Sequence, residues 1–430
     1  MATHAELLAR HREVLPSWMA LYYQEPISLV RGDGRRVWDA EGKEYLDFFG
    51  GILTTMTGYN IPEVTEAVQE QAAKILHSST LYLIEAQIEL AEKIAGLSGI
   101  PDAKVFFTNS GTEANDAAMM LSTINRQSNQ ILALRNSYHG RSFAAVSLTG
   151  NRSWSPTALS PLAVIYIHNG YKYRSPFGHL PDDEFIAACV ADLRDMIDVA
   201  TAGDVAAMIA EPIQGVGGFT TPPDGFFGAF KEVLDEYGIL YISDEVQTGW
   251  GRTGENFWGY QAHDLTPDII TFAKGVGNGL AMGGVIARPD VMDSIKANSI
   301  STFGGNPLST AGALANINYV IEHDLQTNSL KVGNHLKSRL DHLADEEGSI
   351  VGDVRGKGLQ IGVELVKPGT RDPDPAITTR IMENAKDNGL LVGKGGLYGN
   401  VLRVAPPLTL TEAEADEGFE KLEKAIEDAG

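Results

Sequence analysis

Seven short apolar runs alternate with helical segments between residues 105 and 287, and this alternation constrains the fold more than any other feature. The runs are rich in β-branched and aromatic residues and are bounded by Gly, Pro or Asp, a pattern typical of buried strands. They cover residues 105–108, 131–134, 164–168, 208–211, 240–244, 269–273 and 284–287. Helical patterns lie between most of them, for example at 113–126 and 226–237. This order predicts an α/β protein with a largely parallel sheet and right-handed crossovers.

The last connection in this series is different. Only residues 274–283 join the sixth and seventh runs, which is too short for a helical crossover between parallel strands. The seventh strand should therefore run antiparallel to its neighbours.

The pattern changes from about residue 316, which predicts a second, smaller α+β domain. Its expected elements are helices at 316–324 and 330–346, short strands at 358–365 and 401–404, and a closing helix at 412–429. The beginning of the chain has strand signals of its own, with a glycine turn between them, at 28–31 and 36–38. We expect this segment to pack on the C-terminal part. The expected division is therefore 1–57, 58–315 and 316–430.

Composition excludes several classes of function. A formal net charge of −22 argues against nucleic acid or an anionic membrane as the main partner. The one cysteine, Cys189, cannot form an intrachain disulfide, and no metal-ligand spacing appears, so no metal site is expected. The first residues lack the apolar core of a signal peptide, and no apolar stretch is long enough to span a bilayer. These features predict a soluble cytoplasmic protein.

Two ionisable residues end neighbouring strands of the predicted sheet. Asp244 closes the run YISD, and Lys274, thirty positions later, closes DIITFAK. Ligands of open α/β sheets bind at the carboxyl ends of the strands. An amine and a carboxylate there suit pyridoxal phosphate, where the lysine forms a Schiff base and the carboxylate pairs with the pyridinium nitrogen. Either residue alone is more often a surface lysine or a capping aspartate.

Further motifs agree with the same cofactor. The segment TNSGTEAN lies between the first strand and a helix, where small residues, hydroxyls and a helix N-terminus suit a phosphate or a simple N-cap. Tyr138 follows the second strand and could stack on an aromatic ring or be an ordinary buried tyrosine. Glu211 and Arg403 also stand at strand ends, where an arginine serves either a substrate carboxylate or a structural ion pair. The glycines after Lys274 lack the spacing of a dinucleotide-binding loop.

From about residue 20 onward the chain resembles the class III (ω-) aminotransferases of the fold-type-I pyridoxal phosphate enzymes. It is most similar to their alanine–glyoxylate aminotransferase branch. The resemblance is carried by the strings FFGGI, NSGTEAN, SYHGRS, EPIQGVGG, DEVQTGWGRTG, FAKGVGNG, STFGGNPLS, GDVRGKGLQIGVEL and VLRVAPPLT. It implies a large domain with a seven-stranded sheet, one strand of which is antiparallel.

The resemblance also implies roles around the cofactor. Lys274 would hold pyridoxal 5′-phosphate covalently and move the substrate's α-proton. Asp244 would hold the proton on the ring nitrogen. Val246 and Tyr138 would enclose the ring, and Gln247 would bind its phenolic oxygen.

Phosphate and subunit contacts are implied in the same way. Ser110, Gly111 and Thr112 would bind the phosphate, and His139, from the motif SYHGRS, belongs to the expected cofactor-binding set. Thr302 would reach the phosphate bound by a neighbouring subunit. The expected assembly is therefore a homodimer or a dimer of dimers.

Substrate contacts are implied as well. Arg403 would bind the α-carboxylate, and Glu211 would pair with Arg403 when that carboxylate is absent. Arg141 matches a position that binds the distal carboxylate in related enzymes, or it is a solvated loop charge. Ile52 stands where the dialkylglycine-type decarboxylases have glutamine.

Other functions stay open at this point. The decarboxylase and a glutamate-semialdehyde-type aminomutase would use the same scaffold. A catalytically inactive cofactor-binding scaffold and a dehydrogenase are hypotheses from other classes. The family accepts alanine, β-alanine, γ-aminobutyrate, ornithine derivatives and diamines as donors, and pyruvate, glyoxylate or 2-oxoglutarate as acceptors. The sequence does not choose among these, nor between dimer and tetramer.

Overall fold

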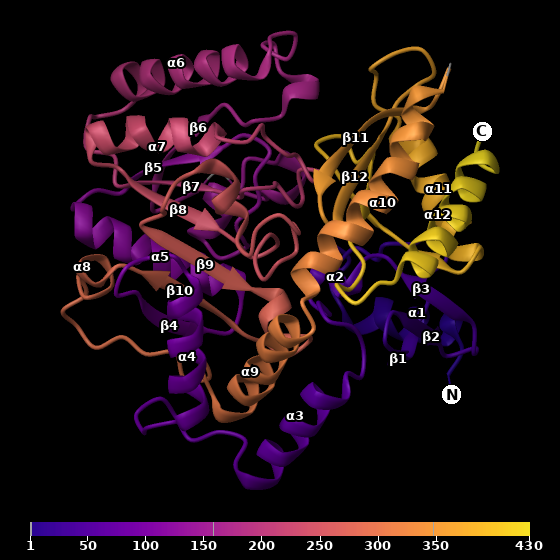
Figure 1. Cartoon of the computed structure of the whole chain (residues 1–430), viewed down its shortest axis with the longest axis horizontal. Coiled ribbons are helices and arrows are strands. Elements are labelled where there is room, and N and C mark those ends of the chain that lie inside the picture. Colours follow the sequence, from indigo (N-terminus) through magenta and orange to yellow (C-terminus); the bar gives the residue numbers. More distant parts are fainter. Residues whose placement is uncertain (1, 158, 347) are drawn as a thin grey trace.

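A seven-stranded sheet forms the centre of the larger part of the molecule (Figure 1). The computed structural model describes residues 2–157, 159–346 and 348–430. The strand order is β4-β10-β9-β8-β7-β5-β6. The strands are β4 (Lys104–Thr108), β5 (Gln130–Leu134), β6 (Ala163–Ile167), β7 (Ala207–Ala210), β8 (Leu240–Asp244), β9 (Ile269–Ala273) and β10 (Gly283–Ala287). All seven predicted strands are confirmed, and β10 is antiparallel to both neighbours, as the short connection required.

Helices cover both faces of this sheet. Helix α5 (Gly111–Arg126) packs its alanine-rich side on one face, because small side chains allow a helix to approach a sheet closely. The other face is covered by α6 (Asp182–Ala200) and α7 (Phe226–Tyr237), which bury a cluster of aromatic residues. Helix α7 begins after Gly225 and ends before Gly238, both with positive φ.

The remaining helices of the larger part lie along its lower side in Figure 1 or are short. The α-helices are α3 (Pro62–Lys74), α4 (Glu85–Leu97), α8 (Pro289–Met292) and α9 (Pro307–Glu322). Five short 3-10 helices fall in loops: η1 (Ala145–Leu148), η2 (Arg152–Trp154), η3 (Lys172–Arg174), η4 (Gly259–His263) and η5 (Lys274–Gly277).

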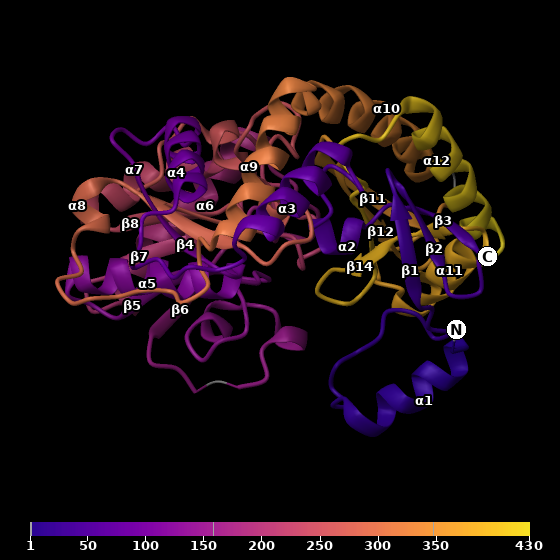
Figure 2. The same ribbon diagram turned by 90° about the horizontal axis from the view of Figure 1, so that it is seen from below.

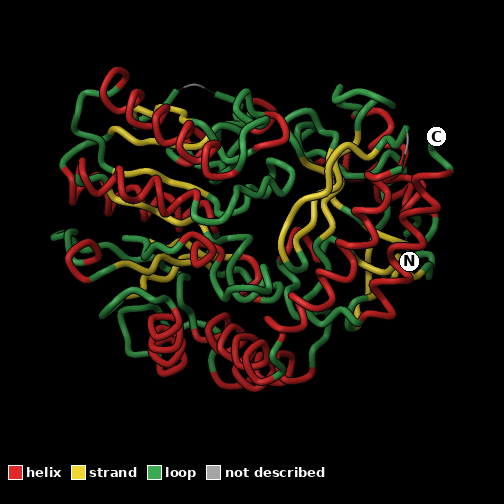
Figure 3. Tube along the Cα trace, turned by 45° about the horizontal axis from the view of Figure 1, so that its top comes forward, coloured by secondary structure: helices red, strands yellow, loops and turns green. Residues whose placement is uncertain are grey.

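A four-stranded antiparallel sheet, in the order β11-β12-β15-β14, forms the centre of the smaller part (Figure 3). Its strands are β11 (Val351–Lys357), β12 (Gln360–Leu365), β14 (Gly393–Gly395) and β15 (Val401–Val404). Helices α10 (Leu325–Asp345), α11 (Pro375–Asp387) and α12 (Glu412–Glu427) complete this part. Strand β11 was not predicted, because its sequence VGDVRGK interrupts the apolar residues with glycine and charge.

The first part of the chain packs on the C-terminal part, as expected (Figure 2). Strand β3 pairs in parallel with β13, which extends a second four-stranded sheet in the order β1-β2-β3-β13. Arg35 and Arg36 form ion pairs with Glu414 and Glu417 of α12. The elements concerned are α1 (His4–Val14), β1 (Leu29–Asp33), β2 (Arg36–Asp39), β3 (Glu44–Asp47), α2 (Gly50–Leu53) and β13 (Leu390–Leu391).

The expected boundary between the two parts lies too early in the chain. The expected division between residues 315 and 316 falls inside α9, which is continuous from residue 307 to 322 and packs on α3 and α4 of the larger part. The chain passes to the smaller part at residues 323–324, between α9 and α10. Met1, the first residue of the expected N-terminal segment, lies outside the described residues.

Candidate active site

The carboxyl ends of the parallel strands surround a cavity of about 370 Å³. Because β4, β5, β7, β8 and β9 all end at this edge, residues far apart in the sequence meet there. Most of the residues singled out in the sequence line this one cavity, namely Ser110, Gly111, Thr112, Tyr138, His139, Glu211, Asp244, Val246, Gln247 and Lys274.

Asp244 is held rigidly at the end of β8. Its Oδ2 accepts a hydrogen bond from Asn115 Nδ2 at 2.8 Å and lies 2.7 Å from His139 Nδ1. Its Oδ1 accepts from the backbone N–H of Val246 at 3.1 Å. A buried carboxylate with this many partners has a fixed direction, and it presents negative charge to the cavity.

Lys274 lies at the end of β9, where the chain turns into η5. Its φ is +49°, an uncommon value for a residue with a side chain. Within the described residues its Nζ makes no hydrogen bond or ion pair. Burial lowers the pKa of Lys274 to about 8, and Arg403 adds to this, while Asp244 and Glu211 act in the opposite direction. A substantial fraction of this amine is therefore neutral near pH 8 and able to act as a nucleophile.

The N-terminus of α5 forms another wall of the cavity. Ser110 caps the helix by accepting from Glu113 N–H. The first backbone N–H groups of a helix have no partner within it, so they attract an anion. A Cβ added to Gly111 would lie 3.0 Å from Val246 Cγ2, which shows how closely these two residues approach. Thr112 Oγ1 faces Gly140 and accepts from the N–H of Arg141 at 3.4 Å.

Tyr138 forms the side of the cavity that follows β5. Its ring meets that of Trp154 edge to face, with 5.6 Å between centroids. Its backbone N–H donates to Glu211 Oε1 at 2.9 Å, and Gly215 N–H donates to Glu211 Oε2 at 2.7 Å. Burial raises the pKa of Glu211, and the nearby Asp244 raises it further, while His139 and the two N–H groups act against the rise.

Arg403 reaches the edge of the site from β15 of the smaller part. Its Nη2 donates to Gln247 Oε1 at 2.6 Å. Its guanidinium lies between two aromatic rings, 4.6 Å from the centroid of Phe219 and 5.2 Å from that of Phe49. Burial lowers the pKa of Arg403. Its Nε has no hydrogen-bond partner within the described residues.

This arrangement differs from the contacts that the sequence led us to expect. Within the described residues Arg403 forms no ion pair with Glu211, whose two oxygens each accept a backbone N–H group. Arg403 donates to Gln247 instead, so Gln247 Oε1 is occupied from the side of the smaller part.

Four expected site residues do not line the cavity, namely Arg403, Arg141, Ile52 and Thr302. Arg141 is exposed, and its guanidinium lies 5.2 Å from the ring centroid of Trp18. Ile52 is 43% exposed and has a φ of +66°. Thr302 is exposed as well, in the loop next to Ser301, whose Oγ accepts from Asn109 Nδ2 at 3.2 Å.

Sequence reasoning missed the role of Asn115. Its side chain is fully enclosed by hydrogen bonds, donating to Asp244 and to the carbonyl of His139 and accepting from Thr271 Oγ1 at 2.7 Å. A signal was available, because asparagine is a poor residue for a helix interior unless its side chain has a buried task. Asn115 thereby connects α5, β8 and β9 beneath the cavity.

The residues present fit pyridoxal 5′-phosphate. The cavity has a fixed carboxylate suited to a pyridinium proton, an amine whose pKa is lowered for covalent attachment, and a helix N-terminus suited to a phosphate. Asp244 lines the cavity, and its direction is fixed by Asn115 and His139.

Comparison with known proteins decides the family. The sequence profile of the class-III aminotransferases matches residues 20–426. The chain belongs to the class-III aminotransferases.

Similar proteins agree with this membership. The chain is 41% identical, over 95% of its length and 85% of the relative's, to "Alanine--glyoxylate aminotransferase 2 homolog 2, mitochondrial" of Arabidopsis thaliana. It is 38% identical to an "Alanine/serine racemase" of Pyrococcus horikoshii, over 98% of this chain and 90% of that one. Among solved structures it is similar to an (S)-enantioselective omega-transaminase from Thermomicrobium roseum, with a TM-score of 0.92, 33% identity and coverage of 100% and 99% of the two chains.

As a class-III aminotransferase, the protein is an enzyme of amino transfer that depends on pyridoxal 5′-phosphate. The fold is that of the fold-type-I enzymes. The decarboxylase and aminomutase hypotheses are not favoured by these relatives.

Replacing Asn115 tests the support of Asp244. Asn115→Ala is expected to lower the free energy of unfolding by about 1–3 kcal/mol, because a buried acceptor loses its donor. It should also lower kcat, because the direction of Asp244 is no longer fixed. Asn125→Ala is the matched control on the same helix, since its amide makes only a long contact of 3.4 Å to Asp290 O. Equal denaturation midpoints and equal kcat for both variants would contradict this role.

Proposed function

We propose that the enzyme moves an amino group from an amino acid or an ω-amino donor to a small α-keto acid, in two half-reactions that share one site. The observation that carries the proposal is the hydrogen bond of Arg403 to Gln247, because Gln247 lines the cavity that holds Lys274 and Asp244. A buried guanidinium with an unpartnered Nε is suited to a carboxylate.

Lys274 and Asp244 perform the chemistry on the larger part of the molecule. When bound, pyridoxal 5′-phosphate accepts the electron pair that the substrate's α-carbon gains on losing its proton. Lys274 would hold the cofactor covalently, and its Nζ would take and return the substrate's proton. Asp244 would keep a proton on the ring nitrogen, and Asn115 and His139 keep Asp244 in place. The N-terminus of α5, at Ser110, would hold the phosphate.

Arg403 binds the α-carboxylate of the keto acid and of α-amino donors. The two rings on either side, Phe49 and Phe219, exclude water and so strengthen this contact. An ω-amino donor places no carboxylate there, and Gln247 already supplies the acceptor that Arg403 needs in that state. Glu211 contributes negative charge nearby without a direct bond.

Arg141 is the residue that we propose for a distal carboxylate. It stands beside the N-terminus of α5, and its side chain rests over Trp18 from the first segment of the chain. Moving the guanidinium from this exposed ring toward the cavity breaks no ion pair within the described residues. Dicarboxylic substrates such as 2-oxoglutarate would depend on this movement.

A second copy of the chain completes the site in our proposal. Large apolar side chains are exposed near Thr302, and they are those of Leu81, Tyr82, Leu83, Ile300 and Phe303. Exposure of this extent favours burial against another subunit. Thr302 would then face the phosphate held by the partner's α5, in a dimer or a dimer of dimers.

We also propose a cytoplasmic location, although similar proteins are named mitochondrial. The sole cysteine, Cys189, is buried, and burial raises the pKa of its thiol to about 12. Within the described residues no helix is both long and apolar enough to cross a membrane.

Lys274 can be tested without turnover. The rate at which cofactor-free protein binds pyridoxal 5′-phosphate covalently, followed by visible absorbance, should rise through a midpoint near pH 8 and then level off. The reason is that only the neutral amine attacks, and burial lowers the pKa of Lys274 to about 8. Lys274→Ala should bind the cofactor without the covalent bond and lose turnover by many orders of magnitude. Lys394→Ala, which changes a lysine of the smaller part, is the control. Substantial turnover by Lys274→Ala would contradict the assignment.

Arg403 is tested with a panel of donors against pyruvate, glyoxylate and 2-oxoglutarate. Arg403→Gln should raise KM for every keto acid, at a cost of several kcal/mol in kcat/KM for a lost bidentate contact. Half-reactions of ω-amino donors should change much less, because their carboxylate does not reach Arg403. Arg141→Gln is the matched comparison and should impair 2-oxoglutarate selectively. An unchanged KM for pyruvate in Arg403→Gln would refute the proposed role, and racemisation of alanine without amino transfer would refute the proposed function.

Thr302 tests the shared site. Thr302→Ala should weaken cofactor retention more than it lowers kcat, because one hydrogen bond to a charged phosphate is worth about 1.5–3 kcal/mol. Thr370→Ala, an exposed threonine of the smaller part, serves as control. Sedimentation should give a dimer or a larger species. A fully active monomer would rule out the cross-subunit contact.

A further inference from the structure

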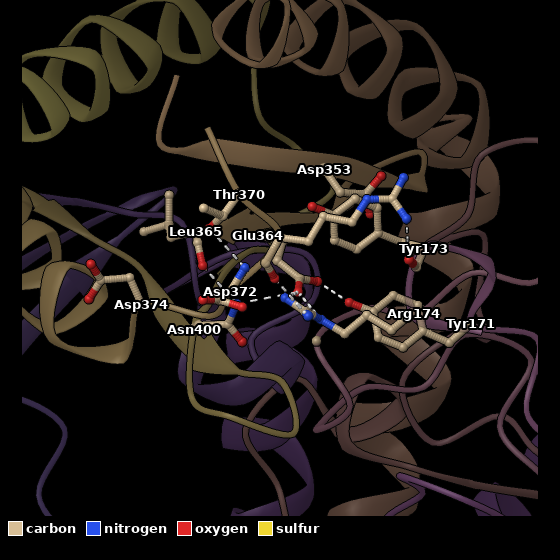
Figure 4. A network of polar contacts seen from close by, with 12 residues as sticks. Tyr171, Tyr173, Arg174, Asp353, Glu364, Leu365, Thr370, Asp372, Asp374 and Asn400 are labelled. Carbon is tan, nitrogen blue, oxygen red and sulfur yellow. Dashed lines mark hydrogen bonds and ion pairs between the residues drawn. The ribbon is translucent and has the colours of Figure 1, made fainter. Parts of the chain in front are cut away.

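A buried charge cluster joins the two parts of the molecule (Figure 4). Its centre is Glu364 of β12, which is fully buried. Glu364 accepts from Arg174 Nε at 2.6 Å, from Arg355 Nη1 at 2.7 Å and from the hydroxyl of Tyr171. Arg174 and Tyr171 come from the larger part, at and just before η3, whereas Arg355 comes from β11. A carboxylate inside the smaller sheet is thus bound by both parts.

The cluster is balanced and ionised. Arg355 also donates to Asp353 Oδ2 at 2.6 Å, so two arginines stand against two carboxylates. Burial acts to raise the pKa of Glu364, but Arg355, Tyr171 and Arg174 outweigh it and hold that pKa below its ordinary value. Removing the charge of Glu364 alone leaves two buried or partly buried guanidinium groups opposite the one carboxylate of Asp353.

Arg355 extends the cluster to the loop that follows Glu211. Its Nε donates to the carbonyl oxygen of Gly218 at 3.0 Å. The N–H of Gly218 in turn donates to the carbonyl of Gly215, whose own N–H donates to Glu211. One continuous set of hydrogen bonds therefore runs from Glu364 to Glu211.

The loop that follows Glu211 also contacts Arg403 through Phe219. The ring of Phe219 lies 4.6 Å from the guanidinium of Arg403. A Cβ added to Gly362 would lie 2.6 Å from Gly218 O, so the loop rests directly on β12 at that glycine. Gly362 is the residue that pairs with Arg403 between β12 and β15. The carbonyl oxygen of Gly218, which accepts from Arg355, therefore contacts Gly362, and Gly362 pairs with Arg403.

We infer that Glu364 and Arg355 are positioning residues, which set the place of Arg403 and Phe219 relative to Glu211 and thereby the affinity for the substrate's α-carboxylate. This inference rests on the proposed role of Arg403. Glu364 acts through two routes, the β12–β15 pairing and the Arg355–Gly218 contact, and touches neither substrate nor cofactor. No other function of the cluster is needed to explain why a carboxylate is kept ionised there.

The first test separates substrate affinity from chemistry. Glu364→Gln in the cofactor-loaded enzyme is expected to raise KM for the best α-keto acid of the panel roughly three- to thirty-fold, the range found for residues that couple two sites. The absorbance of the bound cofactor and kcat at saturating keto acid should stay close to wild type. Tyr171→Phe removes one donor to Glu364 without changing charge or volume much, so it should fold well and shift KM in the same direction by less.

The matched control is Glu236→Gln. Glu236 forms an exposed ion pair with Arg194 on the outer helices of the larger part, so the same chemical change should leave KM unaltered. A general loss of stability would instead lower cofactor loading and kcat together and leave KM for the keto acid unchanged. That outcome, in Glu364→Gln and Tyr171→Phe alike, would overturn the inference.

A double variant distinguishes the positioning role of Glu364 from the carboxylate-binding role proposed for Arg403. In an Arg403→Gln background, Glu364→Gln should have no further effect on the KM for the keto acid, because the group that it positions is absent. If Arg403→Gln raises KM but Glu364→Gln does not, only the positioning role is wrong. Additive effects of the two substitutions would overturn the positioning role as well. If Arg403→Gln leaves KM unchanged, the role of Arg403 itself is wrong and the inference fails with it.

Discussion

The site depends on the backbone pairing of one glycine, Gly283, at the start of the antiparallel strand β10. Gly283 is paired with Thr108 of β4 on one side and with Ala273 of β9 on the other. A Cβ at this position would lie 2.7 Å from the carbonyl oxygen of Ser110, so glycine allows the link between β4 and α5 to lie directly against β10. The helix N-terminus suited to phosphate and the reactive Lys274 consequently flank the same residue. The backbone of the sheet therefore brings the N-terminus of α5 close to Lys274, and no side-chain contact is needed for this.

Much of this architecture could be predicted from the sequence, because its signals are local. Strand β8, for example, begins with the apolar residues Leu240, Tyr241 and Ile242, and α7 is bounded by glycines at both ends. The direction of β10 followed from the length of one connection, a constraint that needs no knowledge of packing. The cavity residues could be predicted for a related reason. Carboxyl ends of parallel strands share one edge, so polar residues placed there in the sequence must meet.

The rest depends on which way side chains turn, and that is decided by tertiary packing. Asn115 looks like any polar residue of a helix until the structure places it under Asp244. The hydrogen bond from Arg403 to Gln247 joins residues of different domains, and no sequence pattern indicates it. Arg355 likewise lies in β11, a strand whose apolar pattern is interrupted by glycine and charge. Neither this strand nor the hydrogen bond from Arg355 to Gly218 could therefore be predicted. The family motifs implied a pair between Arg403 and Glu211, whereas in the structure Arg403 donates to Gln247.

The unbroken helix α9 has a mechanical consequence. It begins in the larger part and continues past residue 316 before the chain turns at Asp324, which has a φ of +48°. A helix of this length is stiff, so any change in the angle between the two parts must take place at the turn between α9 and α10 and not at the expected division. We expect substrates of different size to be accommodated in part by exposed groups at the rim, such as Trp18 and its neighbour Arg141. Entry to the cavity is then governed by rotation of single side chains, which is fast and costs little, while the reactive groups below stay where the sheet puts them.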